Sequence, residues 1–305
     1  MIVLATLIGA ALIAGALADV FKTLFHPAMH GAMSDRIAKM VWRVCRAAAN
    51  RYPKILTFAG PLALLSIIGD WVILNFIGFA LIYWPHVSAH LAGSSHSASF
   101  WGALVTSLEA LSTIAEGGNS ATPGLRVMSG VEAIIGFTIF TASISWLLSI
   151  YPIIESRRSV AHTATLLHEA EKETGLDLIT QASQEASTTM FSVAQELAIL
   201  RNQMAQFPIT HYFYVGEAKT VLAGILPYLA DLADRAVNPA APKNLHIPGT
   251  MLGGAVSNFL SFIAQFVLGQ PSTDRAEIMA AYARDQMCEP VSLAWRKEQK
   301  IRNIA

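Results

Sequence analysis

Residues 61–84 read PLALLSIIGDWVILNFIGFALIYW, a long apolar run that contains one charged side chain, Asp70. A helix needs about 20 mostly apolar residues to cross the hydrocarbon core of a bilayer. The run ends in Tyr83 and Trp84, an aromatic pair typical of the interface between membrane and water. It therefore predicts a transmembrane helix.

Two further runs have the same character. Residues 2–18 (IVLATLIGAALIAGALA) carry no charge, and residues 131–151 (VEAIIGFTIFTASISWLLSIY) contain only Glu132 and are followed by Pro152. We therefore expect three transmembrane helices. Residues 2–18 could instead be a cleaved signal peptide, because Ala-Leu-Ala at 16–18 resembles a cleavage site, but a basic leader is missing. We prefer an uncleaved first helix.

The overall composition agrees with a membrane protein. Of the 305 residues, 14% are charged and 53% are hydrophobic, whereas an average soluble domain carries about 25% charged residues. The net charge of zero argues against a nucleic-acid partner, which would require a basic surface. Cys45 and Cys288 fit neither a disulfide framework nor a zinc site.

The distribution of Lys and Arg along the sequence predicts how the chain is oriented in the cell membrane, whether plasma or inner membrane. Residues 20–54 hold seven Lys or Arg and one acid, residues 85–125 hold no Lys or Arg, and Arg157 and Arg158 follow the third run. By the positive-inside rule the N-terminus lies outside. Residues 1–25 are then a transmembrane helix, 26–54 a basic cytoplasmic amphipathic segment, and 153–305 a helical cytoplasmic domain.

The cytoplasmic domain should contain four or five helices, divided at Gly175, Pro208, Pro227, residues 239–242 and Pro271. Its uncharged stretch 251–269 (MLGGAVSNFLSFIAQFVLG) is long enough for a fourth span. A crossing there would place six later cations outside, so we prefer a buried helix, for example one at a subunit interface.

The loop between the second and third apolar runs has a sequence pattern that predicts structure of its own. Residues 99–112 (SFWGALVTSLEALS) predict an amphipathic helix too short to span, and residues 113–123 (TIAEGGNSATP) lead directly into the third run. A short helix followed by a Gly-containing return is typical of a re-entrant loop, which is tolerated only where it is buried in protein or lines water. The predicted fold is an all-α membrane protein with a re-entrant pore helix and filter loop.

Residues 55–152 resemble the two-helix pore module of the tetrameric potassium-channel superfamily, and the strings FALIYWP and SIYP are similar to a bacterial branch of potassium channel family proteins. The family filter reads Thr-Val-Gly-Tyr-Gly-Asp after a Thr or Ser, and its carbonyls replace the hydration shell of the ion. The resemblance implies a homotetramer with Gly136 as the gating hinge and with Glu109 and Ser112 behind the filter. The corresponding filter residues are Thr113, Ile114, Ala115, Glu116, Gly117 and Gly118.

The filter departs from the family at three positions. Ala115 stands where the first Gly would be, Glu116 where the Tyr would be, and Gly118 where the Asp would be. A ring of glutamates attracts cations and weakens discrimination by size. We expect a cation pore with weakened potassium selectivity, permeant to K⁺ and Na⁺, with Thr113 and Glu116 contacting the ion and Ca²⁺ binding at Glu116. No other cofactor is implied.

Other readings remain open. A nonconducting sensor or scaffold would act through its cytoplasmic helices, and a membrane enzyme would use Glu109 and Glu116 as an acid pair, although no catalytic constellation accompanies them. The intramembrane acid Asp70 is either functional or paired with a cation or Asn75. Glu132 is expected to be a packing or hydrogen-bonding residue beside the short helix. Hydroxyls at Ser143, Ser145 and Ser149 either line a vestibule or reflect ordinary helix polarity.

Overall fold

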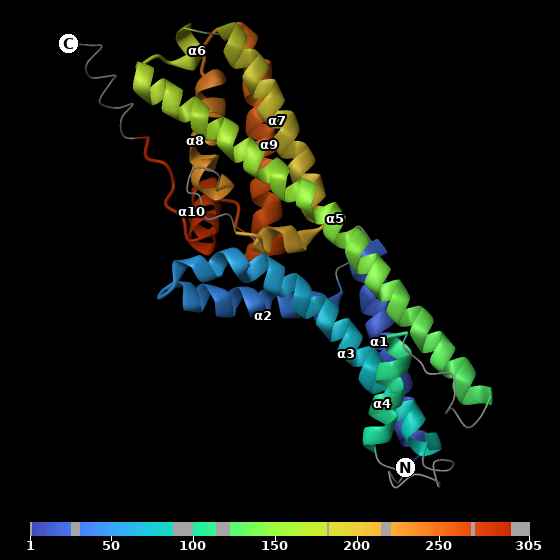
Figure 1. The fold of residues 1–305 in the computed structure, drawn as a ribbon. Coiled ribbons are helices and arrows are strands. Elements are labelled where there is room, and N and C mark those ends of the chain that lie inside the picture. Colours follow the sequence, from blue (N-terminus) through green and yellow to red (C-terminus); the bar gives the residue numbers. More distant parts are fainter. Residues whose placement is uncertain are drawn as a thin grey trace. The chain divides into compact units, whose positions relative to one another are not determined.

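The computed structural model describes residues 2–25, 31–87, 100–113, 123–181, 183–214, 221–269 and 272–293, and every element in them is helical (Figure 1). The expectation of an all-α chain is confirmed. The elements are α1 (Ile2–Phe25), α2 (Ala32–Ala49), η1 (Pro53–Phe58), α3 (Ala59–Val87), α4 (Phe100–Leu111), α5 (Pro123–Thr174), α6 (Leu178–Gln181), α7 (Ser183–Gln206), η2 (Pro208–Tyr212), α8 (Leu222–Ala236), η4 (Lys243–Leu245), α9 (His246–Phe262), η5 (Ile263–Leu268) and α10 (Arg275–Asp285).

Four helical segments among these residues are long and apolar enough to cross a membrane. They are Ile2–Leu24, Pro53–Pro85, Pro123–Thr174 and Lys243–Leu268. The first three contain the predicted spans. The short helix of the loop is α4, which begins and ends within one residue of the predicted range.

The chain divides into two compact units. Unit 1 comprises Met1–Asn50 and Ala59–Ser149, and unit 2 comprises Arg51–Phe58 and Ile150–Ala305. In unit 1, α3 contacts α1, α2 and α4 (Figure 1). Helix α2 contacts α3 and α1, and its buried residues are Ser34, Ala38, Trp42, Cys45 and Ala49.

Helix α5 is longer than the sequence suggested. We expected the third span to end at Pro152, but α5 continues through this proline as far as Thr174. Proline removes one backbone donor, and the buried side chains of Ile150 and Ile153 on either side of it keep the helix packed. The helix ends at the expected Gly175, which has φ +69° and donates its N–H to the Glu171 carbonyl.

Unit 2 is a helical bundle in which α9 packs against α7 and α8. Leu252, Val256 and Phe259 of α9 have no exposed surface, so one face of this helix packs in the core of the unit. The segment is also one of the four that are long and apolar enough to span, so the buried helix expected of stretch 251–269 stays a prediction. The predicted break at Pro227 is wrong, because α8 continues through it. The helix tolerates this proline because its neighbours Leu226 and Tyr228 are fully buried.

Candidate functional site

Helix α4 lies between α3 and α5 in unit 1. Its Ala103 is fully buried with Phe79 and Tyr83 of α3, and apolar residues of α5 pack against this cluster. At the start of α4, Phe100 meets Trp84 edge to face, with ring centroids 5.5 Å apart. The buried face repeats at Ala103, Ser107 and Ala110, the spacing that places side chains on one side of a helix.

A polar contact joins all three helices at one point, and we call its members the α4 brace: Tyr83, Ser107 and Glu132. The Tyr83 hydroxyl donates to Glu132 Oε2 at 2.7 Å, and Ser107 Oγ lies 2.5 Å from Glu132 Oε1. Ser107 Oγ also lies 2.9 Å from the carbonyl oxygen of Phe76. Ser107 and Glu132 have no exposed surface, and Tyr83 has 1%. The expectation that Glu132 is a packing or hydrogen-bonding residue beside the short helix is confirmed.

The C-terminal end of α4 abuts α5 at Gly136. A methyl group added there would lie 2.8 Å from the carbonyl oxygen of Leu111, the last residue of α4. Gly136 lies five residues beyond Val131, where the predicted third span begins (136 − 131), which corresponds to about 8 Å along the helix axis at 1.5 Å per residue. The end of α4 therefore packs against the first turns of the predicted span. Gly136 permits this close approach, which gives it a packing role besides the hinge inferred from the sequence.

Thr113 follows α4 in an uncommon backbone conformation. Its φ is +58°, and its N–H bonds to the Ala110 carbonyl. The left-handed region is unfavourable for a β-branched residue, so the surrounding structure holds Thr113 there at a cost of about 1–2 kcal/mol. Glu109, Ser112 and Thr113 are exposed in the single chain. The remaining filter residues, Ile114, Ala115, Glu116, Gly117 and Gly118, lie outside the described residues.

One face of α5 carries a row of hydroxyl side chains, which we call the hydroxyl stripe: Thr138, Thr141, Ser145 and Ser149. Their spacings of three and four residues place them on one side of the helix, and all four are exposed. Each hydroxyl bonds to the carbonyl four residues earlier, at 2.7 to 3.2 Å. Ser143, which we had grouped with Ser145 and Ser149, is instead buried.

Of the acids in the spans, Asp19 has a role that the sequence did not reveal. Its carboxylate accepts hydrogen bonds from the backbone N–H groups of Met33 and Ser34 in the first turn of α2, from the Ser34 hydroxyl, and from Trp71 Nε1 at 3.0 Å. A carboxylate is favourable at a helix N-terminus, where backbone donors are unpaired. Asp19 thus joins α1, α2 and α3.

The predicted pairing of Asp70 is not found among the described residues. Asp70 Oδ2 is buried without a hydrogen-bond partner there, and the Asn75 amide bonds to the Trp71 carbonyl instead. A structural ion pair or an Asn75 contact is therefore not supported by the described residues and stays a prediction. The functional alternative remains a prediction.

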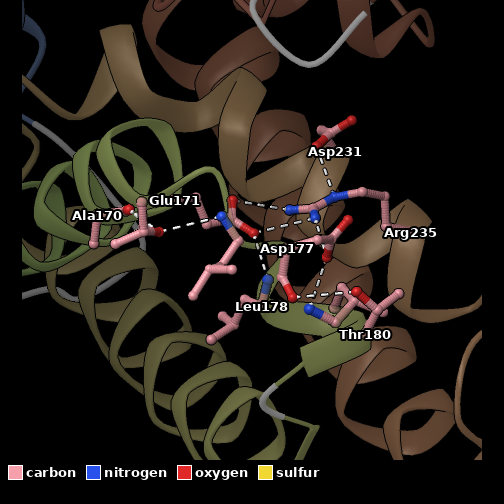
Figure 2. A network of polar contacts seen from close by, with 10 residues as sticks. Ala170, Glu171, Asp177, Leu178, Thr180, Asp231 and Arg235 are labelled. Atoms are coloured by element: carbon pink, nitrogen blue, oxygen red, sulfur yellow. Dashed lines mark hydrogen bonds and ion pairs between the residues drawn. The ribbon is translucent and has the colours of Figure 1, made fainter. Parts of the chain in front are cut away.

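In unit 2, two arginines fix the part of α5 that follows the predicted third span. The buried Arg157 donates to the carbonyls of Thr210, His211 and Phe213 around η2. Arg235 of α8 bonds to Glu171 and Asp177 at the end of α5 and to Asp231 at 3.0 Å (Figure 2). Glu171 also accepts the Leu178 N–H at 2.9 Å. The end of α5 is therefore anchored within unit 2.

A buried histidine lies beside this anchor. His211 Nε2 lies 2.9 Å from Asp285 Oδ2 and 3.2 Å from Gln286 Nε2. Burial lowers the pKa of His211 below its usual 6.5, with Arg157 acting in the same direction and Asp285 opposing both. No group of three or more potential metal ligands of the His, Cys, Asp or Glu type occurs in the part of the chain that the structure describes.

Comparisons with known proteins support the membrane assignment and little beyond it. The chain matches no family model and no solved structure. An uncharacterized membrane protein, YdjJ of Bacillus subtilis (strain 168), is 26% identical over 212 residues. The match covers 67% of this chain and 60% of that relative, less than two thirds of its length. Together with the apolar helices, it identifies the chain as a helical membrane protein.

Proposed function

We propose that the chain forms a homotetrameric cation channel, with residues 113–118 lining the narrow part of the pore and α5 lining the wider part. The observation that carries this proposal is the placement of α4. The α4 brace and Gly136 hold the C-terminal end of this short helix against the predicted third span, about 8 Å beyond its first residue, Val131. A helix that stops at such a depth needs a neighbouring chain or water for its free backbone groups.

The charge at this end favours cations. The last carbonyls of a helix carry partial negative charge, and the last turn of α4 contains no basic residue. Ser112 and Thr113 add exposed hydroxyl oxygens to the same end. If Glu116 follows in each of four subunits, its carboxylates add a ring that attracts K⁺, Na⁺ and Ca²⁺ and weakens selection for potassium.

The hydroxyl stripe supports a water-lined path along α5. Hydroxyls bonded to their own helix are tolerated in lipid, but a row of four on one exposed face also suits a surface that meets water or ions. Each hydroxyl donates its proton to the carbonyl four residues earlier in α5. The lone pairs of the hydroxyl oxygen then remain available to water or ions in the proposed pore. Four copies of α5 around an axis would place four such stripes toward the pore.

Planar-bilayer recordings of purified protein under bi-ionic potassium and sodium conditions test the proposal. We expect cation currents with a reversal potential near zero, because the filter differs from the family pattern at Ala115 and Glu116. Glu116→Gln should reduce block by calcium while preserving the tetramer. Strong potassium selectivity would contradict the weakened filter, and currents carried by chloride would contradict the cation path.

A nonconducting membrane sensor is the second candidate, and the anchoring of α5 within unit 2 favours it as well. Arg157 and Arg235 tie the long helix to the bundle at two points, so a partner bound to the bundle could act on α5 without any ion flow. A tetramer that gives no current under any cation gradient would support this candidate over the channel.

A further inference from the structure

A cavity of about 380 Å³ lies between the beginning of α1 and the end of α3. Ala5 and Ile8 line it from α1, and Leu81, Trp84 and Pro85 line it from α3, with two further apolar residues from the first turn of α1. We call it the α1–α3 groove. Its volume falls in the range of about 300–1,000 Å³ that is typical of small-ligand pockets.

The groove arises from the way the two helices cross. A methyl group on Gly9 would overlap the Gly78 carbonyl oxygen, and a methyl group on Gly78 would lie 2.7 Å from the Ile13 side chain. Small residues let the two backbones touch at this crossing. Helices that touch at one point diverge away from it, and the groove occupies the wedge between the glycine crossing and the ends of α1 and α3.

The chemistry and the shape of the groove select its occupant. Ile2 and Ile8 are 59% and 46% exposed, so the groove opens on the outer surface of two helices that are apolar enough to span a bilayer. It extends along α1 from Ile2 to Ile8, or about 9 Å at 1.5 Å per residue. A helix of a second copy, about 10–12 Å across, is too wide for a wedge between touching helices, whereas a single hydrocarbon chain fits.

We propose that the α1–α3 groove binds one acyl chain of a membrane phospholipid. Trp84 lies at the end of α3 where its indole suits the level of the lipid headgroups, so the chain enters beside Trp84 and passes down toward the glycine crossing. Neither helix can close the wedge by itself, because the contact between Gly9 and Gly78 fixes their separation. The lipid fills space that would otherwise remain unpacked. This inference does not depend on ion conduction.

The test compares a variant that fills the groove with one that adds the same bulk elsewhere. Ala5→Phe places a ring in the groove, and Ala14→Phe places one on an exposed face of α1 outside it. The measurements are native mass spectrometry of the full chain after exchange into detergent, and quenching of Trp84 fluorescence by phosphatidylcholine brominated on its acyl chain. Trp84→Phe identifies the part of the signal that comes from Trp84.

We expect wild type and Ala14→Phe to retain one more phospholipid per protomer than Ala5→Phe, and Trp84 quenching to fall in Ala5→Phe alone. Equal lipid retention in all three proteins would overturn the proposal. Retention that is unchanged while Ala5→Phe alters the oligomeric state would show that a second copy covers the groove instead. If Ala5→Phe does not fold, the smaller change Ala5→Leu gives the same comparison.

Discussion

Removal of the α4 brace should loosen α4 from α3 and α5. Tyr83→Phe removes the hydroxyl that donates to Glu132 at 2.7 Å and leaves a fully buried carboxylate with one donor fewer. An unsatisfied buried polar group costs about 1–3 kcal/mol. Glu132→Ala also opens a cavity and leaves both Tyr83 and Ser107 without the carboxylate, which should cost about 3–5 kcal/mol.

The assay is the free energy of unfolding in mixed micelles for the two single variants and their double variant. Because both residues take part in the same contact, we expect a coupling energy of about 0.5–3 kcal/mol between Tyr83→Phe and Glu132→Ala. Thr106→Ala is the matched control, since among the described residues the Thr106 hydroxyl bonds to the Gly102 carbonyl of its own helix alone. If the two single-variant losses of unfolding free energy simply add in the double variant, Tyr83 and Glu132 are not coupled. That result, or a Thr106→Ala loss as large as that of Tyr83→Phe, would contradict the α4 brace.

Four other perturbations follow from the geometry. Gly136→Ala should destabilise unit 1 by about 1–3 kcal/mol through overpacking against Leu111, whereas Gly130→Ala, whose new methyl group meets no described residue within 4 Å, should not. Thermal unfolding of both variants compares them. Thr113→Gly should stabilise the chain by about 1 kcal/mol because glycine adopts the positive φ freely, and an unchanged unfolding midpoint would contradict this strain. Arg235→Met should cost about 3–5 kcal/mol by removing the guanidinium that neutralises the buried Glu171, while Lys39→Met, at an exposed pair, should cost less than about 1 kcal/mol in the same denaturation assay. Because the unfolded chain binds the His211 proton more readily than the folded chain, the stability of unit 2 should be complete above pH 6.5 and fall as the pH drops below that value toward the lower folded pKa; His211→Gln should flatten this part of the pH profile.

Hydropathy predicted the elements of unit 1 well, because a spanning helix must be apolar along its whole length. The same rule located α4, since a run of 12 residues is too short to span and is bounded by polar sequence. It also identified Glu132 as a packing or hydrogen-bonding residue, because a buried acid next to a short helix has few other ways to be satisfied.

The sequence was less informative wherever the answer depended on contacts between distant residues. Pro152 and Pro227 read as helix ends, but tertiary packing carries α5 and α8 through them. The capping of α2 by Asp19 was missed because the carboxylate comes from another helix, 14 residues before Met33. An acid near the end of an apolar run, followed by a helix that lacks a local cap, is the signal that could have indicated it.

The most direct test of the central claim is chemical modification of α5 during current recording. In a background without Cys45 and Cys288, single cysteines are placed at Ser145 on the exposed hydroxyl stripe and at the buried Ser143. A charged methanethiosulfonate reagent should block the cation current rapidly at Ser145→Cys and leave Ser143→Cys unaffected. Equal insensitivity of the two variants, or a tetramer that carries no cation current, would contradict a conducting path along this face.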